Sequence, residues 1–499
     1  MNRQYFENPR FQAYVLPVGL LLLNIILKSI FLGSQSIAND EPFTIYHAQL
    51  RLPFLISELS RYNNPPGFEI LLHYWIKVFG ISPASVRFLP MVISALSAVM
   101  LYFLGRKFFS LRIGLFAALL FTFSDFQIYF AHEARVYSLF TLLTLISMYS
   151  FLNLVSEKGT IRMKAVYVIA NALLLYAHFF GFWIILVQLI CTLFINNLRN
   201  RFWKEYLVLF GIPLILFLPY LRIFLARFVQ SAGDGTWVRP PKGLTAILDL
   251  LRTFMNEAYG ETLLGKPILS GITLAIMAFA LFNLIRSKQL YAASKQGIII
   301  TTWFCAPLIL VYSFSYVVPM LIDRYMVFIT PAFFLLIALS VENLHKNAGI
   351  RQITVFGLLF LMLLTCKFDP ENHRDVKGVV QKIKALKSKP NTLVYLCPEW
   401  FDLNFVYYYE PAWFKEVDNT VTKGLLRERL RGDGINPIYA MGEIDSTAIA
   451  NADRIVFLDA GADFAIPGNG IKAYLQAHFK LTKMSEYPEI FKIYEFEKP

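Results

Sequence analysis

Residues 11–32 read FQAYVLPVGLLLLNIILKSIFL, an apolar run that leads into the acidic pair of Asn39-Asp40-Glu41-Pro42. A helix needs about 20 apolar residues to cross a bilayer, so this run is long enough to span one. Its core is too long for a typical signal peptide, and we expect a retained anchor. Charged groups at the mouth of a membrane protein are costly to hold there without a purpose. Asp40 and Glu41 are therefore the first candidates for chemistry.

Apolar runs of similar length recur along much of the chain. Of the 499 residues, 56% are hydrophobic and only 16% are charged, which lies outside the range of soluble globular proteins. We therefore predict an α-helical polytopic membrane protein with about eleven transmembrane helices. The expected spans are residues 11–32, 83–105, 113–130, 137–155, 165–180, 182–198, 206–225, 267–285, 297–318, 325–343 and 352–366.

The Lys and Arg residues of this region gather in alternate loops, on the same side as the basic N-terminus. The positive-inside rule makes that side cytoplasmic, and the loop at 33–82 and the tail then lie outside. Anionic lipid explains the net charge of +13 better than nucleic acid does, so no nucleic-acid partner is expected. The basic clusters lie at 106–112, 158–164, 199–204, 286–295 and 346–351.

Residues 66–79 are apolar but do not fit a span. The segment is too short, and Glu69, His73 and Lys77 interrupt it. Counting it as a span would reverse every later loop. We therefore predict an interfacial helix within the outer loop.

The tail has a different composition, which divides the chain into two expected domains. Residues 1–367 form a transmembrane domain whose outer loop, 33–82, carries the Asp-Glu motif, and residues 368–499 form a soluble α/β domain. The tail shows no catalytic constellation, so we expect it to shape acceptor choice without performing the reaction. Its tyrosines at 407–409 could stack on sugars, although packing in a core is the commoner use of such a run. Periodicity predicts helices at 374–387 and 468–479, and strands at 392–397, 437–441, 454–458 and 489–497.

Asp40 and Glu41 open a helix-like run at 43–52, and two interpretations are open. In the structural one, Asn39 or Asp40 caps the helix and Pro42 occupies its first turn. In the functional one, a carboxylate at the boundary of water and lipid accepts a proton from a hydroxyl group.

Other polar residues are expected at the outer ends of the spans. Arginine binds phosphate oxygens through two parallel hydrogen bonds, and this would be strong near lipid. Each of these residues could instead be an interfacial anchor, but a random scatter would not place them all on one face. The candidates for binding substrate are Asn64 before two prolines, Glu133, Arg135 and Tyr137 in one segment, His178, and Arg324.

The ordered set of motifs resembles the GT-C superfamily of integral-membrane glycosyltransferases. The resemblance is to the branch that includes protein O-mannosyltransferases and the aminoarabinose transferase of lipid A. It covers most of residues 1–345. The motifs are the Asp-Glu pair, the Pro-Pro pair, LLHYWIKVFG (71–80), SVRFLPMVISALSAVMLYFLGRKFF (85–109), FAHEARVYSL (130–139), YAHFFG (176–181) and DRYMVFITPAFFLLIA (323–338).

The resemblance implies an inverting glycosyltransferase that uses a polyprenyl-phosphate-linked sugar. The acceptor would be a hydroxyl group of a lipid, glycan or protein, on the outer face of a bacterial inner membrane. Asp40 matches the position of the acidic residue that is catalytic in the family. Asn64 stands where the family often has His, so the resemblance does not carry a phosphate or metal role over to this position. The resemblance fixes no cofactor, and a divalent metal is the one candidate.

The main alternative is a transporter or flippase of lipid-linked glycans. Such a protein should show ionisable groups within its spans and broken helices near the membrane midplane. The sequence has few charges at span centres. A receptor-like anchor ranks last, because the tail shows no nucleophile, metal cluster or phosphate loop.

Overall fold

The structure is a computed structural model, and it divides into two compact units that are described here one at a time. The first unit comprises Met1–Ile30, Leu59–Phe68 and Arg87–Pro370, and the second comprises Phe31–Glu58, Glu69–Val86 and Glu371–Pro499. The described residues are 8–62, 65–156, 159–234, 238–257, 266–286, 295–368, 374–417, 423–466, 468–488 and 490–498.

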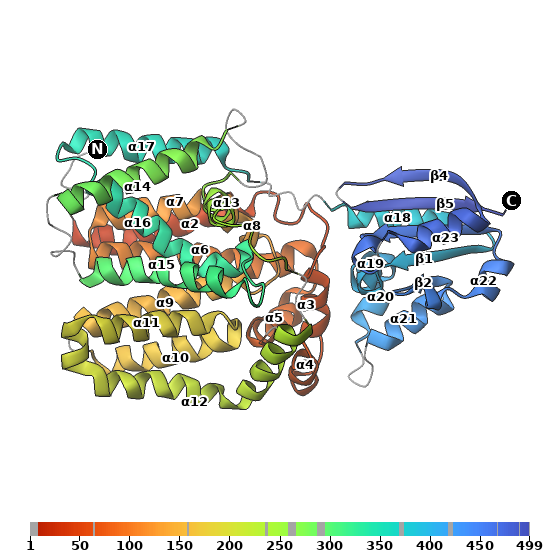
Figure 1. The fold of residues 1–499 in the computed structure, drawn as a ribbon, viewed down its shortest axis with the longest axis horizontal. Helices are drawn as coiled ribbons and strands as arrows, with labels where there is room; N and C mark the ends of the chain where they lie inside the picture. Colours follow the sequence, from red (N-terminus) through yellow and green to blue (C-terminus); the bar gives the residue numbers. More distant parts are fainter. Residues whose placement is uncertain are drawn as a thin grey trace. The chain divides into compact units, whose positions relative to one another are not determined.

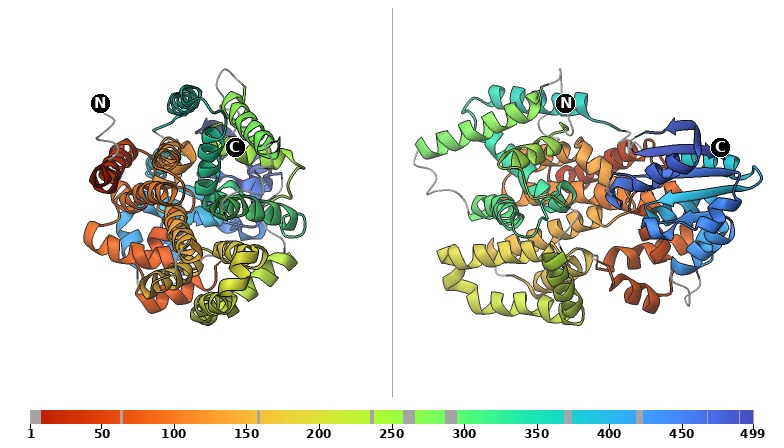
Figure 2. Two further views of the ribbon diagram at one scale, coloured as in Figure 1. Left: turned by 90° about the vertical axis from the view of Figure 1, so that its left-hand side faces the viewer. Right: turned by 45° about the vertical axis from the view of Figure 1, so that its right-hand side comes forward.

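Long apolar helices make up the first unit. Helices α9 to α12 lie next to one another, and the left view of Figure 2 shows several helices end-on, as in a bundle (Figures 1 and 2). The helices are α2 (Leu16–Ser29), α6 (Pro83–Phe108), α7 (Leu111–Thr122), α8 (Asp125–Ala131), α9 (Tyr137–Ser156), α10 (Ile161–Ala177), α11 (Gly181–Phe194), α12 (Asn196–Asp234), α13 (Thr245–Phe254), α14 (Ile268–Arg286), α15 (Lys295–Phe314), α16 (Thr330–Glu342) and α17 (Ala348–Thr365). A π-helical turn, η1 (Phe11–Val15), leads into α2, and a 3-10 segment, η5 (Asp323–Ile329), leads into α16.

Each predicted span falls on a helix or a helix pair. Seven helices among the described residues are long and apolar enough to cross a membrane. Helices α7 and α8 together make an eighth candidate, bent by 63° where the chain breaks between them. Helices α11 and α14 are apolar over shorter stretches. The prediction of a polytopic helical protein is thus confirmed, while the count of eleven spans stays a prediction.

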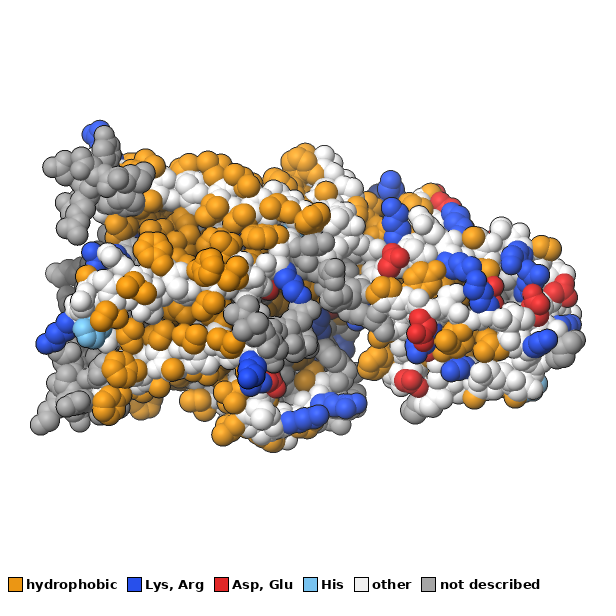
Figure 3. Space-filling view, turned by 90° about the horizontal axis from the view of Figure 1, so that it is seen from above, with side chains coloured by type: hydrophobic (Ala, Val, Ile, Leu, Met, Phe, Trp, Pro, Cys, Tyr) orange, Lys and Arg blue, Asp and Glu red, His pale blue; other side chains and the backbone are white. Residues whose placement is uncertain are grey.

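The surface of the first unit is that of a protein in lipid. On the face shown in Figure 3, apolar side chains cover the helices of this unit, and charged side chains gather on the unit that contains the sheet. Large apolar residues such as Ile215, Ile353 and Phe356 are exposed on the helices. A soluble protein rarely exposes so large an apolar area, and lipid would cover it.

A close helix contact explains one pair of glycines in the first unit. A Cβ atom on Gly105 would lie 2.5 Å from the backbone of Gly114, and the reverse substitution would clash equally. These residues lie at the end of α6 and the start of α7. Only glycine lets the two backbones approach so closely.

The outer loop forms three short helices. They are α3 (Glu41–Ala48), α4 (Leu52–Leu59) and α5 (Gly67–Phe79). The helix-like run predicted at 43–52 is thus two helices, because the chain breaks between Gln49 and Arg51. Helix α5 exposes Leu71, Tyr74, Val78 and Phe79, and Val78 is 74% exposed. Their spacing puts them on one face, which fits the predicted interfacial position.

The tail is a small α/β fold, as predicted. Its five-stranded sheet has the order β2-β1-β3-β5-β4, in which β1 is parallel to β2 and β3, while β5 is antiparallel to β3 and β4. Buried side chains of β1, β3, β5 and α23 form its core. The strands are β1 (Thr392–Cys397), β2 (Ile435–Pro437), β3 (Arg454–Ala460), β4 (Lys480–Glu486) and β5 (Phe491–Glu497), and the helices are α18 (Val376–Lys387), α19 (Asp402–Tyr409), α20 (Pro411–Lys415), α21 (Lys423–Gly432), α22 (Ser446–Asn451) and α23 (Gly470–His478).

The division into units differs from the expected domains 1–367 and 368–499. Most of the 33–82 loop belongs to the second unit, together with the tail. Helix α19 of the tail lies against α3 of the loop, and hydrogen bonds join the two segments. Contacts between residues so far apart in sequence leave no periodic signal in either segment.

Candidate active site

Asp40 directly precedes helix α3 in the second unit. Asn39 has a left-handed backbone, with φ of 53°, and Asp40 follows as the N-cap residue with φ of −91° and ψ of −3°. The Asp40 side chain makes no capping hydrogen bond and has other interactions instead. Pro42 occupies the first turn, as the sequence predicts. The carboxylate is thus placed at the start of a helix without serving as its cap.

Glu41 stabilises the turn that presents Asp40. Its Oε2 accepts a hydrogen bond from the Ala38 amide at 3.3 Å, and its own amide donates to the Ala38 carbonyl oxygen at 3.1 Å. Glu41 is only 2% exposed. Buried carboxylates need hydrogen-bond donors to offset their loss of water, and the backbone supplies one here. This contact is structural, and the predicted part of Glu41 in the reaction stays a prediction.

Helix α5 supports α3 through two polar side chains. Thr44 Oγ1 donates to Glu69 Oε1 at 3.4 Å, and His73 Nδ1 donates to the Ala48 carbonyl oxygen at 2.8 Å. Glu69 and His73 are four residues apart on one helical face, and both are buried. In the sequence, these residues look only like interruptions of an apolar segment. Their spacing of four residues was the signal that both side chains contact the same element, which is helix α3.

In the first unit, the structure brings five predicted substrate-binding residues together. The guanidinium groups of Arg135 and Arg324 both act electrostatically on His178. The same two groups, with the Glu133 carboxylate, act on Tyr137. Arg324 is half-buried, and the other four residues are buried. We call Glu133, Arg135, Tyr137, His178 and Arg324 the arginine cluster.

Aromatic rings fix the position of His178. Its ring stacks on Phe140 with centroids 4.8 Å apart, and the Tyr325 ring meets it edge-on at 5.3 Å. The Phe180 amide donates to His178 Nδ1 at 3.1 Å, so Nε2 of the neutral ring carries the proton. The neutral imidazole can thus donate one hydrogen bond from Nε2.

Lys28 was not among the predicted site residues, but it is a buried cation in helix α2, with 0% of its surface exposed. Its Nζ donates to Ser94 Oγ at 2.9 Å and lies 5.0 Å from the centre of the Phe121 ring. His132 Nε2 donates to the Lys28 carbonyl oxygen at 2.6 Å, which ties α2 to the segment that leads to Arg135. Within an apolar run a single lysine resembles an interfacial anchor, so the residue type gave no sign of its burial.

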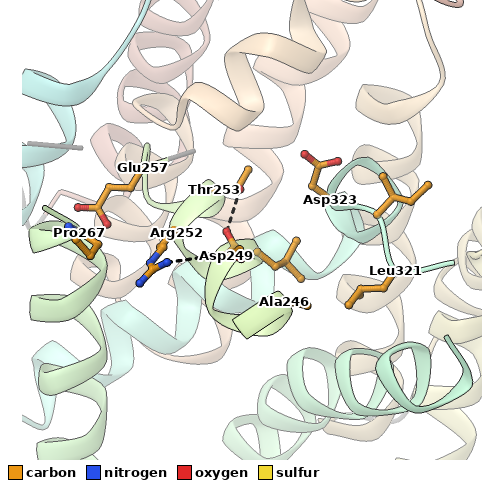
Figure 4. Close-up of a pocket in the computed structure, with 10 residues that line it drawn as sticks. Ala246, Asp249, Arg252, Thr253, Glu257, Pro267, Leu321 and Asp323 are labelled. Carbon is orange, nitrogen blue, oxygen red and sulfur yellow. Dashed lines mark hydrogen bonds and ion pairs between the residues drawn. The ribbon is translucent and has the colours of Figure 1, made fainter. Parts of the chain in front are cut away.

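A cavity of about 570 Å³ opens in the first unit beside η5. Figure 4 shows Asp249 and Arg252 of α13 joined by an ion pair, with an N···O distance of 2.8 Å, and Asp323 contributed from the start of η5. Asp323 adjoins Arg324 of the arginine cluster in the chain. The volume lies in the range typical of small-molecule sites. Glu257 also lines the cavity, and its two oxygens accept from the amides of Leu269 and Ser270 in the first turn of α14.

The remaining predictions concern Asn64 and a metal. Asn64 lies outside the described residues. Among the residues that the structure describes, no group of three or more His, Cys, Asp or Glu side chains could hold a metal ion.

The apolar helices and the buried arginine cluster define an integral membrane protein with a polar site. Residues 63–223 match the family model described as dolichyl-phosphate-mannose-protein mannosyltransferase. A comparison with curated proteins gives no match.

Solved structures of membrane enzymes are similar to nearly the whole chain. ArnT from Cupriavidus metallidurans in the apo state has a TM-score of 0.58 at 11% identity, covering 96% of this chain and 97% of that chain. The same protein bound to undecaprenyl phosphate has a TM-score of 0.59 at 12% identity, covering 97% and 98%. The archaeal oligosaccharyltransferase AglB from Archaeoglobus fulgidus, in complex with an inhibitory peptide and a dolichol-phosphate, has a TM-score of 0.52 at 12% identity, covering 90% and 70%.

These similarities confirm the resemblance to the GT-C superfamily. The chain shares its fold with ArnT, and the similarity covers 96% of its length. At such low identity the solved structures establish the fold alone. The family model reaches Glu133, Arg135, Tyr137 and His178, whereas Asp40 lies before its range.

Proposed function

We propose that this protein is an inverting glycosyltransferase that moves a sugar from a polyprenyl-phosphate carrier to a hydroxyl acceptor. The observation that carries the proposal is the arginine cluster, in which two guanidinium groups act electrostatically on one buried histidine, within a GT-C fold. A similar structure was solved with undecaprenyl phosphate bound, which supports a carrier of that class. A lipid-linked donor also gives a reason for the enzyme to be embedded in the bilayer.

The reaction is a single displacement, with Asp40 as the base. The Asp40 carboxylate takes the proton of the acceptor hydroxyl as its oxygen attacks the anomeric carbon. The bond from that carbon to the carrier phosphate breaks, and the phosphate leaves with the electron pair. Attack opposite the leaving group inverts the anomeric centre, by analogy with single-displacement glycosidases. Phosphate is a good leaving group, so no general acid is needed.

The arginine cluster serves the departing phosphate. As the bond breaks, negative charge grows on the phosphate oxygens, and preorganised cations lower the energy of that state. Arg135 and Arg324 supply the positive charge, and His178 supplies a neutral donor through Nε2. Glu133 and Tyr137 complete the polar lining. The cavity beside η5, which Asp323 lines, then has room for part of a substrate.

We further propose a location in the bacterial inner membrane, with a cytoplasmic N-terminus and a periplasmic tail. The segregation of Lys and Arg clusters supports this orientation. In that topology the arginine cluster and Asp40 both face the periplasm. Lipid-linked donors and acceptors of the cell envelope would meet the enzyme there.

Two observations favour the alternative of a transporter. Lys28 is a buried ionisable group within a spanning helix, and α7 and α8 form a broken span. However, Lys28 is the penultimate residue of α2, so it lies at a span end, and its ammonium group already binds Ser94. The glycosyltransferase hypothesis is therefore better supported than the transporter hypothesis.

The test is to reconstitute the purified protein with radiolabelled polyprenyl-phosphate sugars and a panel of envelope lipid and glycan acceptors. We expect free polyprenyl phosphate to be released together with a product of inverted anomeric configuration. Passage of intact donor across the vesicle membrane, without cleavage of the sugar–phosphate bond, would establish the transporter instead.

A further inference from the structure

We propose that helix α19 of the tail positions the catalytic aspartate, with Tyr408 and Asn404 as positioning residues. The inference rests on the proposed role of Asp40 as the base. It gives the tail a part in the reaction itself, beyond acceptor choice. All the contacts that carry it lie within the second unit.

The first contact binds the segment before Asp40. The Ile37 amide donates a hydrogen bond to the Tyr408 hydroxyl oxygen at 2.6 Å. Ile37 and Ala38 are fully buried, so their amides have no access to water. A buried amide without a partner costs about 1–3 kcal/mol, which makes this hydroxyl important for the backbone at Ile37.

The second contact holds the residue next to Asp40. Asn404 Nδ2 donates to the Asn39 carbonyl oxygen at 3.2 Å. Asn39 has a left-handed backbone, and that conformation is unfavourable for most residues. The peptide unit that this bond fixes is the one that joins Asn39 to Asp40. Its orientation sets the direction in which the Asp40 side chain leaves the backbone.

Two further hydrogen bonds flank these contacts. The Lys377 amide, in the first turn of α18, donates to Ser36 Oγ at 3.2 Å. Gln49 Nε2, just after α3, donates to the Phe414 carbonyl oxygen at 3.1 Å. Residues 36–39 belong to no helix or strand, so they cannot satisfy their own backbone groups. The tail satisfies two of these groups, the Ile37 amide and the Asn39 carbonyl oxygen, and it also binds the Ser36 side chain.

Asn404 and Tyr408, which hold residues 37–39, are four residues apart and lie on one face of α19. The neighbouring tyrosines bind elsewhere. The Tyr407 hydroxyl donates to the Ile81 carbonyl oxygen at 2.7 Å, and the Tyr409 hydroxyl donates to Asp433 Oδ2. The rings of Tyr407 and Tyr408 meet edge-on, with centroids 4.8 Å apart. The tyrosine run therefore uses its hydroxyls within the protein. Tyr409 has its partner inside the tail, and it provides a matched control for Tyr408.

The effect of loosening this segment can be estimated. A displacement of about 1 Å at a reacting group can lower the rate about 100-fold, because reacting atoms must be held at bonding distance. Donor binding is assigned to the arginine cluster of the first unit, so it should not depend on Tyr408. A positioning role thus predicts a lower kcat with an unchanged affinity for the carrier.

The experiment compares Tyr408→Phe, Asn404→Leu and the double variant with Tyr409→Phe, all in the full chain. Transfer rates, binding of polyprenyl phosphate and hydrogen exchange of the Ile37–Glu41 amides are measured. We expect kcat to fall about 10- to 100-fold in the double variant, with carrier binding unchanged and faster exchange at Ile37. Tyr409→Phe also loses one hydroxyl hydrogen bond, yet it should keep both kcat and the exchange rate of that segment.

Three outcomes would overturn the positioning role. They are equal kcat in the double variant and wild type, an equal loss in Tyr409→Phe, or unchanged exchange at Ile37. If the double variant does not fold, the same comparisons are made with Tyr408→Phe and Asn404→Leu separately. Absence of transfer by the wild-type protein would contradict the proposed function alone, because the exchange of the Ile37–Glu41 amides is measured without any substrate.

Discussion

The Asn404 amide donates a hydrogen bond to the carbonyl oxygen of Asn39, the residue directly before Asp40. The two residues are far apart in the chain, yet they belong to one compact unit. Helix α3, which Asp40 directly precedes, is therefore supported from the tail as well as by α5. The catalytic role of Asp40 and the support that it needs can be tested separately.

Asp40→Asn should abolish most transfer. Loss of a general base typically lowers the rate about 10²- to 10⁴-fold, because the acceptor hydroxyl keeps its proton. The amide is nearly isosteric, so folding and binding of polyprenyl phosphate should not change. Glu41→Gln is the matched control, since the Gln Oε1 can still accept from the Ala38 amide. An equal loss in both variants would point to structure and not to proton transfer.

Arg135→Ala should weaken binding of the carrier or slow departure of its phosphate. Lysine should restore only part of the function, because it lacks the planar fork that binds two phosphate oxygens. Arg324→Ala should behave similarly. Arg351→Ala is the control, since Arg351 forms an ion pair with Glu342 elsewhere in the same unit. Wild-type binding of polyprenyl phosphate by both the Arg135 and the Arg324 variants would show that these residues are interfacial anchors.

Filling the cavity beside η5 should raise the KM for one substrate. Ala246→Trp adds a large side chain to the lining of the cavity. Leu244→Trp is the control, because Leu244 is 71% exposed and does not line it. Initial rates measured against donor and acceptor separately would tell which substrate enters. Unchanged kinetics in Ala246→Trp would exclude the cavity from the substrate path.

Arg427→Met should destabilise the tail. Arg427 Nε lies 2.7 Å from Asp402 Oδ2, and Asp402, at the start of α19, is only 1% exposed. Removing one partner of a buried ion pair typically costs about 3–5 kcal/mol, because a charge remains buried alone. Double replacement of Arg427 by Met and Asp402 by Leu should recover much of this loss. Thermal unfolding followed by tryptophan fluorescence would measure both effects.

A reporter that is active only in the cytoplasm, fused after Pro499, should be silent. The same reporter at the N-terminus should be active, because the basic loops share that side. Strong activity at the C-terminus would mean that the number of spans is even, with both termini in the cytoplasm. It would also move the proposed site to the cytoplasmic face.

Much of the fold could be predicted because a bilayer imposes a minimum length on apolar runs. Every predicted span falls on a helix, and the predicted strand 392–397 is β1. The prediction of a strand at 437–441 was wrong, because β2 is Ile435–Pro437. Strand β4 was missed, since it lies at the edge of the sheet and most of its residues are exposed and polar.

The arginine cluster could be predicted in part, since its members lie at span ends on one expected face. Lys28 could not, because a lysine near a span end is usually exposed at the interface. The support of Asp40 by Asn404 and Tyr408 was also beyond prediction. Neither residue stands in a motif, and their partners are backbone atoms, which leave no trace in residue type.

The hydrogen bond from Ile37 to Tyr408 closes a loop in which the residues are 371 positions apart. At about 5–20 residues per second, synthesis of that stretch takes on the order of tens of seconds. Until α19 has been made, the amide of Ile37 has no hydroxyl to bind, and the chain around Asp40 lacks its final form. A ribosome-bound or truncated chain would therefore carry the apolar helices and the arginine cluster but turn over slowly, so full activity would come only with the completed protein.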